Sequence, residues 1–136
     1  MKPVKTFNVL GERVDVITCG EMTNGASTLV IQTTSPGGGP PPHKHTREDE
    51  TFTVLEGDFE VLDSGQWRSV PKGEFLFAPR GSIHTFRNVG TTDGRMAVFI
   101  APAGLEGFFE QIEGLTPADM PKLVEIANKF GLTFYL

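Results

Sequence analysis

The chain has 136 residues and a formal net charge of −5 at pH 7, with Lys and Arg scattered along it. This length gives one domain with its own hydrophobic core, and an acidic chain without a basic stripe argues against nucleic acid and anionic membranes as partners. The single Cys19 cannot form an internal disulfide, and no signal-like or membrane-spanning apolar run occurs, so we expect a cytoplasmic protein.

The first part of the sequence has the pattern of short β-strands. Sixteen Gly and ten Pro residues punctuate the chain, which is typical of an all-β protein with tight turns. Alternating apolar residues predict strands at 7–10 and 12–18, then a turn-rich loop over 19–25. The strand expected at 27–34 is apolar on both faces, which places it inside a pair of sheets.

A segment rich in glycine and proline, residues 35–42, follows these strands. It cannot pair as a central strand, because proline lacks an amide donor and glycine adds backbone freedom. Two interpretations stay open for it. It is either a plain connector or a mobile rim that admits or covers a ligand.

The next residues include the histidine pair His43 and His45, from a chain that has three histidines. Residues i and i+2 of a strand point to one face about 7 Å apart, so both imidazoles can converge on one metal ion. Glu50 lies at an odd offset from His45, and an unbroken strand would turn its carboxylate to the other face. The sequence therefore predicts a bend at 46–49, with Glu48 as a solvated bend residue, and a new strand from Glu50.

The third histidine, His84, follows a tight turn at 79–81 and opens a predicted strand over 83–88. Only a closed or double sheet can bring it beside the first pair. Between them, Ser64-Gly65 predicts a hairpin in which Trp67 is a packing residue. Four apolar or amide side chains share a face with these histidines and Glu50, and we expect them to line a substrate pocket: Phe52, Val54, Phe86 and Asn88.

The end of the chain changes from strand to helix patterns. After a strand at 95–100, apolar residues recur at helical spacing over 105–113, and a second short helix runs from Asp119 as N-cap to Gly131 as C-cap. Its apolar face should cover an open end or side of the barrel. Residues 132–136 predict a terminal strand that pairs with a sheet of this chain or of a second subunit.

The spacing of these residues resembles the two signature motifs of the cupin family. Motif one, residues 37–57, reads Gly37-x5-His43-x-His45-x4-Glu50-x6-Gly57, and motif two, residues 73–88, reads Gly73-x5-Pro79-x-Gly81-x2-His84-x3-Asn88. The resemblance is to a small single-domain cupin of the conserved-barrel type. It implies one domain over 1–136, an all-β double-stranded β-helix (jelly-roll barrel), with a C-terminal helical extension and terminal strand over 105–136. It also implies that one metal ion has the ligands His43, His45, Glu50 and His84.

This ligand set suits one divalent transition metal. Three imidazoles and a carboxylate without a thiolate accept Fe, Mn, Ni, Co, Cu or Zn, and they leave positions for water, O₂ or a chelating substrate. Because an imidazole must be neutral to bind, we expect metal loss as the pH falls through roughly 6.5.

The tail residues 107–110 and 132–135 resemble those of the quercetin dioxygenase-like group of cupins. This implies a metal-dependent dioxygenase for a small aromatic, flavonol-like or other oxygen-chelating substrate, with Glu50 as ligand and catalytic base. Two alternatives stay open: a metal-dependent isomerase or lyase of a small sugar-like substrate, and a non-catalytic small-ligand-binding module. The dispersal of Arg47, Arg80 and Arg87 disfavours a phosphorylated sugar. Because many cupins dimerise, we expect a homodimer.

Overall fold

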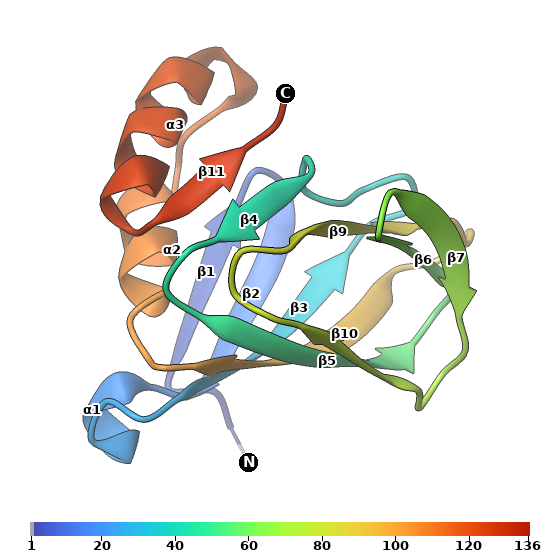
Figure 1. The fold of residues 1–136 in the computed structure, drawn as a ribbon, viewed down its shortest axis with the longest axis horizontal. Helices are drawn as coiled ribbons and strands as arrows, with labels where there is room; N and C mark the ends of the chain where they lie inside the picture. Colours follow the sequence, from blue (N-terminus) through green and yellow to red (C-terminus); the bar gives the residue numbers. More distant parts are fainter. Residues whose placement is uncertain (1) are drawn as a thin grey trace.

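The structure is a computed structural model that describes residues 2–136. Two antiparallel sheets form the layers of a barrel, and helices pack at one side of it (Figure 1). In spatial order, the first sheet contains β1 (Lys5–Val9), β2 (Glu12–Thr18), β3 (Thr28–Thr34), β10 (Gly94–Ala101), β5 (Asp49–Glu56) and β8 (Phe75–Ala78). The second contains β11 (Leu132–Phe134), β4 (His43–His45), β9 (Ile83–Asn88), β6 (Phe59–Asp63) and β7 (Gln66–Val70). The predicted all-β jelly roll with a short C-terminal helical segment is confirmed.

The core consists of side chains that alternate inward along the strands. In the first sheet Val98 lies opposite Val30 on one side and Phe52 on the other, and all three are buried. Met96, two residues before Val98 on the same face of β10, is fully buried. Period-two alternation therefore places one face of each strand in the interior, as the sequence predicts.

The hairpin between β6 and β7 has the turn that its sequence predicts. Ser64 and Gly65 both have positive φ, 53° and 78°, as a two-residue primed turn requires. The packing role expected for Trp67 is wrong, because its ring lies on the outer face of the edge strand and is 39% exposed. The Arg87 guanidinium lies 3.8 Å from the Trp67 ring centroid, so the tryptophan forms a surface cation–π contact.

The region expected to be a turn-rich loop contains one turn of helix, α1 (Gly20–Thr23). The Thr23 hydroxyl donates to Ser27 O at 2.7 Å, and Asn24 ends the turn in the left-handed region. The Glu106 carboxylate accepts hydrogen bonds from Gly20 N at 2.7 Å and from the Thr28 hydroxyl at 2.7 Å. This loop is therefore fixed to the C-terminal segment by one partly buried acidic side chain.

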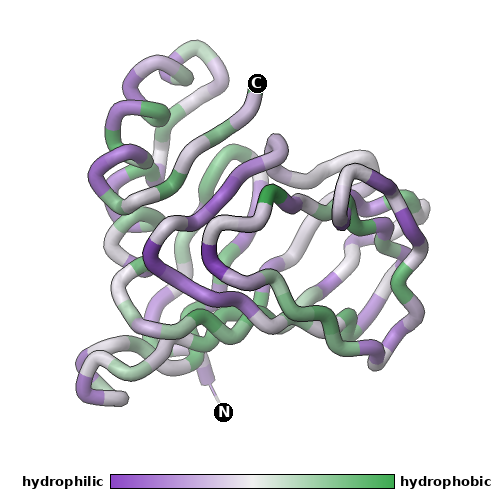
Figure 2. The backbone as a smooth tube through the Cα atoms, in the orientation of Figure 1, coloured by the Kyte–Doolittle hydropathy of each residue, from purple (hydrophilic) through white to green (hydrophobic). Residues whose placement is uncertain are grey.

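The C-terminal segment contains α2 (Glu106–Ile112), a 3₁₀ turn η1 (Pro117–Asp119) and α3 (Met120–Lys129), followed by β11. Asp119 is the N-cap residue of α3, as predicted, but its side chain makes no capping hydrogen bond to that helix. Its carboxylate instead accepts from Thr116 N at 2.8 Å in a capping box. Gly131, with φ 72°, follows the end of α3, where a C-cap glycine is expected. Along α3 hydrophilic and hydrophobic residues alternate (Figure 2), and the apolar ones face the barrel.

The terminal strand pairs within the chain. β11 is antiparallel to β4, with Leu132 opposite His45 and Phe134 opposite His43. The structure thus selects the intramolecular alternative for this strand. Within residues 2–136, no helix has the length and apolar character needed to cross a membrane.

Candidate metal centre

The three histidines and Glu50 come from three strands that meet inside the barrel. β4 carries His43 and His45, and His43 lies directly opposite His84 of the neighbouring β9. The chain bends after His45 and enters β5 at Asp49, so Glu50 reaches the same interior from the facing sheet. The predicted strand break between His45 and Glu50 is confirmed.

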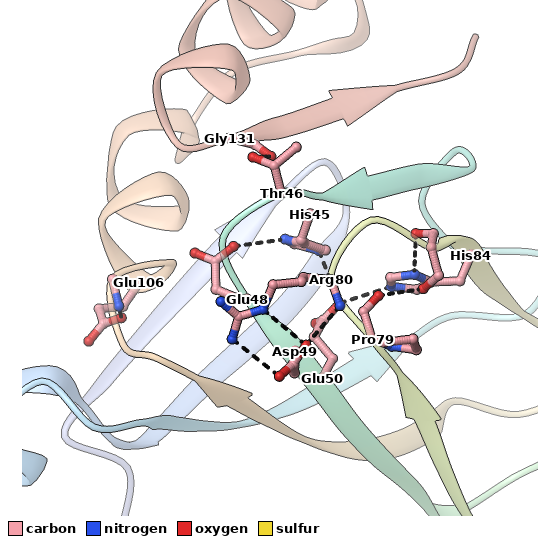
Figure 3. A network of polar contacts seen from close by, with 12 residues as sticks. His45, Thr46, Glu48, Asp49, Glu50, Pro79, Arg80, His84, Glu106 and Gly131 are labelled. Carbon is pink, nitrogen blue, oxygen red and sulfur yellow. Dashed lines mark hydrogen bonds and ion pairs between the residues drawn. The ribbon is translucent and has the colours of Figure 1, made fainter.

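The four side chains are buried and close together. Glu50 Oε1 lies 2.9 Å from His84 Nε2 and 3.0 Å from His45 Nε2 (Figure 3). One donor atom from each of the four residues, His43 included, lies within 4.8 Å of all the others. A site of this size and composition could hold a metal ion.

The outward ring nitrogens indicate how the imidazoles are oriented. His43 Nδ1 lies 2.8 Å from Pro41 O, and His84 Nδ1 lies 3.2 Å from Ser82 O. A carbonyl oxygen only accepts, so each Nδ1 carries the proton in these contacts, and a neutral ring of this tautomer would present its Nε2 lone pair to a metal once the Glu50 carboxylate beside His84 also binds the ion. The residues present therefore fit a metal ion.

Glu48 was expected to be solvated, and this prediction is wrong. It is 4% exposed, and its Oε1 lies 3.4 Å from His45 Nδ1, on the side of the ring away from Glu50 (Figure 3). The short segment between β4 and β5 folds back against the C-terminal segment, since Thr46 N donates to Gly131 O at 2.9 Å. The bend therefore places Glu48 in the interior.

Burial and charge affect the metal-free ligands in different directions. Burial lowers the pKa of His43 to about 4, an effect that the nearby His84 reinforces. Burial also opposes a charge on His45, but Glu50 and Glu48 outweigh it and raise the pKa of His45 to about 9. Burial acts to raise the pKa of Glu50, yet His45 and His84 hold it well below its usual range. At neutral pH the metal-free site therefore contains a buried His45–Glu50 ion pair.

Metal affinity should depend on pH through His45. A metal bound at Nε2 displaces a proton from His45 at every pH below about 9, whereas His43 is already neutral above about 4. We expect the metal dissociation constant to fall about tenfold per pH unit between 7 and 9, with about one proton released per ion. Calorimetric titration in buffers of different ionisation enthalpy measures both the dissociation constant and the number of protons released. An affinity that is flat across this range would contradict the assignment.

A cavity of about 250 Å³ opens beside the cluster. Phe52 and Phe86 line it, as predicted, and the Phe52 ring lies 6.1 Å from that of His84. A large part of its remaining wall comes from apolar residues of the C-terminal segment, whose contribution to the pocket the sequence did not indicate: Leu105, Phe108, Phe109, Ile112, Met120, Leu123, Leu132 and Phe134. Within the described part of the chain, no Lys or Arg lines this cavity.

Two residues expected in the pocket lie in the core instead. Val54 is 1% exposed and pairs across the sheet with Met96. Asn88 is also 1% exposed, and its amide is used in structure: Nδ2 donates to Thr34 O and Thr92 O, and Oδ1 accepts from Gly90 N. Both are on the predicted face but lie too far along their strands to reach the cavity.

The glycine/proline segment forms a packed rim of this cavity. Gly37 N donates to Asn88 O at 2.9 Å, and Asn88 N donates to Gly38 O at 3.0 Å. At Gly39, with φ 148°, a side chain would collide with the Phe86 carbonyl oxygen. The segment therefore lines the cavity with its backbone bonded to β9, and its role in admitting or covering a ligand stays a prediction.

Comparison with known proteins identifies the family. The family model described as the cupin domain matches residues 30–100, which include both histidine motifs. The chain belongs to the cupin family. Its two-sheet barrel and buried His/Glu cluster are those expected from the motif spacing.

Several proteins are similar to this cupin. An uncharacterized protein of Aquifex aeolicus is 34% identical over 88 residues, covering 65% of this chain and 69% of its own length. Oxalate oxidase GF-3.8 of Triticum aestivum is 42% identical over 73 residues, covering 48% of this chain and 33% of the wheat protein. A recombinant oxalate oxidase solved in complex with glycolate is 32% identical with a TM-score of 0.60, covering 75% of this chain and 58% of that one. The cupin thus spans about half or less of these oxidases.

Proposed function

We propose that this cupin is a metal-dependent dioxygenase-like enzyme that acts on a small aromatic or other oxygen-chelating substrate. The observation that carries the proposal is a cluster of three imidazoles and a carboxylate that faces an apolar, phenylalanine-lined cavity. Such a site offers a metal at one end and a surface for an apolar ring at the other.

In this proposal each part of the site has a separate task. His43, His45 and His84, with Glu50, would hold Fe, Mn, Ni, Co, Cu or Zn, and that ion would activate O₂ or polarise the oxygens of the substrate. Glu50 is ionised at neutral pH, so its free oxygen is available to accept a substrate hydroxyl proton. Phe52 and Phe86, which line the cavity, would pack against the aromatic ring of the substrate and exclude water from it.

The cavity volume restricts the substrate. About 250 Å³ lies just below the roughly 300–1,000 Å³ of typical ligand pockets. One aromatic ring with two adjacent oxygens fits this volume better than a three-ring flavonol. A flavonol would require the helical wall to move outward.

A sugar phosphate fits the site poorly. Within residues 2–136, no cationic side chain lines the cavity, and two of the three dispersed arginines are paired with carboxylates. Arg80 forms a salt bridge with Asp49, with 3.2 Å between Nη2 and Oδ2. Arg87 forms one with Glu60, with 2.6 Å between Nη2 and Oε1. A phosphate would enter an apolar pocket in which the metal is the sole counter-charge, and burying its remaining charge there is costly.

A second candidate is the oxidation of a small oxygen-chelating acid such as oxalate. It is favoured by the 42% identity over 73 residues with a wheat oxalate oxidase, and by a related oxidase solved with glycolate bound. The absence of a cation from the cavity lining makes a dianion the weaker fit.

Oxygen uptake by separately metal-loaded protein distinguishes these functions. We expect uptake with catechol or a flavonol in the presence of Fe(II), Mn(II), Ni(II) or Cu(II), without release of hydrogen peroxide, and no uptake by the metal-free protein. Uptake with oxalate and stoichiometric peroxide would support the oxidase instead. No uptake with any combination, despite bound metal, would contradict both and favour a ligand-binding module.

A further inference from the structure

Glu48 is a buried carboxylate that the metal ligand set does not include. We infer that Glu48 is a positioning residue: it fixes the His45 ring from the outer side and adds a second negative charge to the metal centre. This inference rests on the proposed metal site, and it concerns a residue outside the four expected ligands.

The His45 ring lies between two carboxylates. Its Nε2 is 3.0 Å from Glu50 Oε1, and its Nδ1 is 3.4 Å from Glu48 Oε1. All three side chains are at least nine-tenths buried. If Nε2 of His45 binds a metal, Nδ1 is the nitrogen that carries the proton of the neutral ring, and Glu48 Oε1 is the carboxylate oxygen that lies 3.4 Å from it.

His45 differs in this respect from the other two histidines. The Nδ1 atoms of His43 and His84 face the backbone carbonyls of Pro41 and Ser82, which are neutral acceptors. Only His45 has a full charge behind it. A carboxylate behind a ligand imidazole makes the inner nitrogen a stronger donor to the metal.

The chain holds Glu48 in place from both sides. On one side, Thr46 donates to Gly131 O through N at 2.9 Å and through Oγ1 at 3.0 Å. On the other, Asp49 points outward and accepts from Arg80 N at 2.8 Å (Figure 3). These bonds fix the chain two residues before Glu48 and one residue after it, and the Glu48 side chain between them is buried.

Glu48 has little else to interact with. Its Oε1 atom is fully buried, and no well-aligned hydrogen-bond donor reaches it from residues 2–136, just as none of their acceptors reaches His45 Nδ1. An uncompensated buried carboxylate is unfavourable, so its proximity to His45 is the interaction that accounts for it.

The decisive variant is Glu48→Gln, which retains the shape and an acceptor oxygen but removes the charge. We expect it to bind one metal ion per chain with about 10- to 100-fold lower affinity than the wild type. With Co(II) as the probe, its visible absorption bands should shift, because the His45 nitrogen becomes a weaker donor. Glu48→Asp keeps the charge and should bind with an affinity between those of the wild type and Glu48→Gln.

The matched control is Glu74→Gln, which removes the same charge from an exposed residue paired with Arg68 at 3.3 Å. Its affinity and Co(II) spectrum should equal those of the wild type. A Glu48→Gln protein with wild-type affinity and spectrum would overturn the inference alone, as would a Glu48→Asp protein that binds more weakly than Glu48→Gln. A wild-type protein that binds no Co(II) would overturn the metal site as well.

Discussion

Replacing Glu50 with Gln should abolish tight metal binding while leaving the fold intact. Glu50 is the only carboxylate among the four clustered residues, and its Oε1 contacts both His45 and His84. Loss of an outer partner of a ligand costs about 10- to 100-fold in affinity, so loss of the anionic ligand itself should cost at least about 100-fold. Titration of the metal-free protein with Zn(II) or Mn(II), with elemental analysis, measures the change.

The control for this variant is Glu60→Gln. Glu60 is partly exposed on β6 and pairs with Arg87, far from the cluster along its strand. The metal affinity of the Glu60→Gln variant should match that of the wild type within about twofold, as expected when a surface charge is removed. Equal affinities for Glu50→Gln and the wild type would remove Glu50 from the ligand set.

Truncating Phe108 to Ala should produce the largest loss of stability. Phe108 is 3% exposed at the centre of an aromatic group on the C-terminal segment, with ring centroids 6.0 Å from Phe130 and 6.4 Å from Phe134. Removal of a buried phenylalanine lowers the free energy of unfolding by about 3–5 kcal/mol. Urea unfolding of the metal-free protein measures this change.

Phe77→Ala provides the comparison, because Phe77 is 64% exposed on edge strand β8. Its effect should stay near ~0.5 kcal/mol. If both variants lost equally little stability, residues 105–136 would be a loosely attached appendage and not a wall of the cavity.

Strand parity explains why the His/Glu cluster could be predicted and why only two of the four residues expected in the pocket line the cavity. Alternation put His43 and His45 on one face and required a break before Glu50, as the structure confirms. Parity gives the face of a strand but not the depth along it. Phe52 and Phe86 therefore reach the cavity, whereas Val54 and Asn88, on the same faces, are enclosed by the core.

Glu48 could have been recognised from the sequence. It precedes Glu50 by two residues, so both carboxylates point inward once the strand geometry extends back through Asp49. The polar composition of 46–49 instead suggested a solvated bend. Composition was a weaker guide than parity here, because the bend is covered by the Gly131 turn.

The partner of the terminal strand could not be predicted. Residues 132–136 showed strand character, but the choice of β4 as its neighbour depends on the length and packing of α2 and α3, which bring the chain back over the cavity. The same three-dimensional return makes Leu132 and Phe134 part of the cavity wall. Local patterns contain no information about such a register.

The most direct test of the metal centre is an anomalous difference map from crystals of the wild-type protein loaded with Zn(II). We predict one strong peak inside the barrel, about 2.0–2.2 Å from the Nε2 atoms of His43, His45 and His84 and from one oxygen of Glu50. A peak bound by other residues, or no peak while Glu50 stays hydrogen-bonded to His45 and His84, would contradict the account.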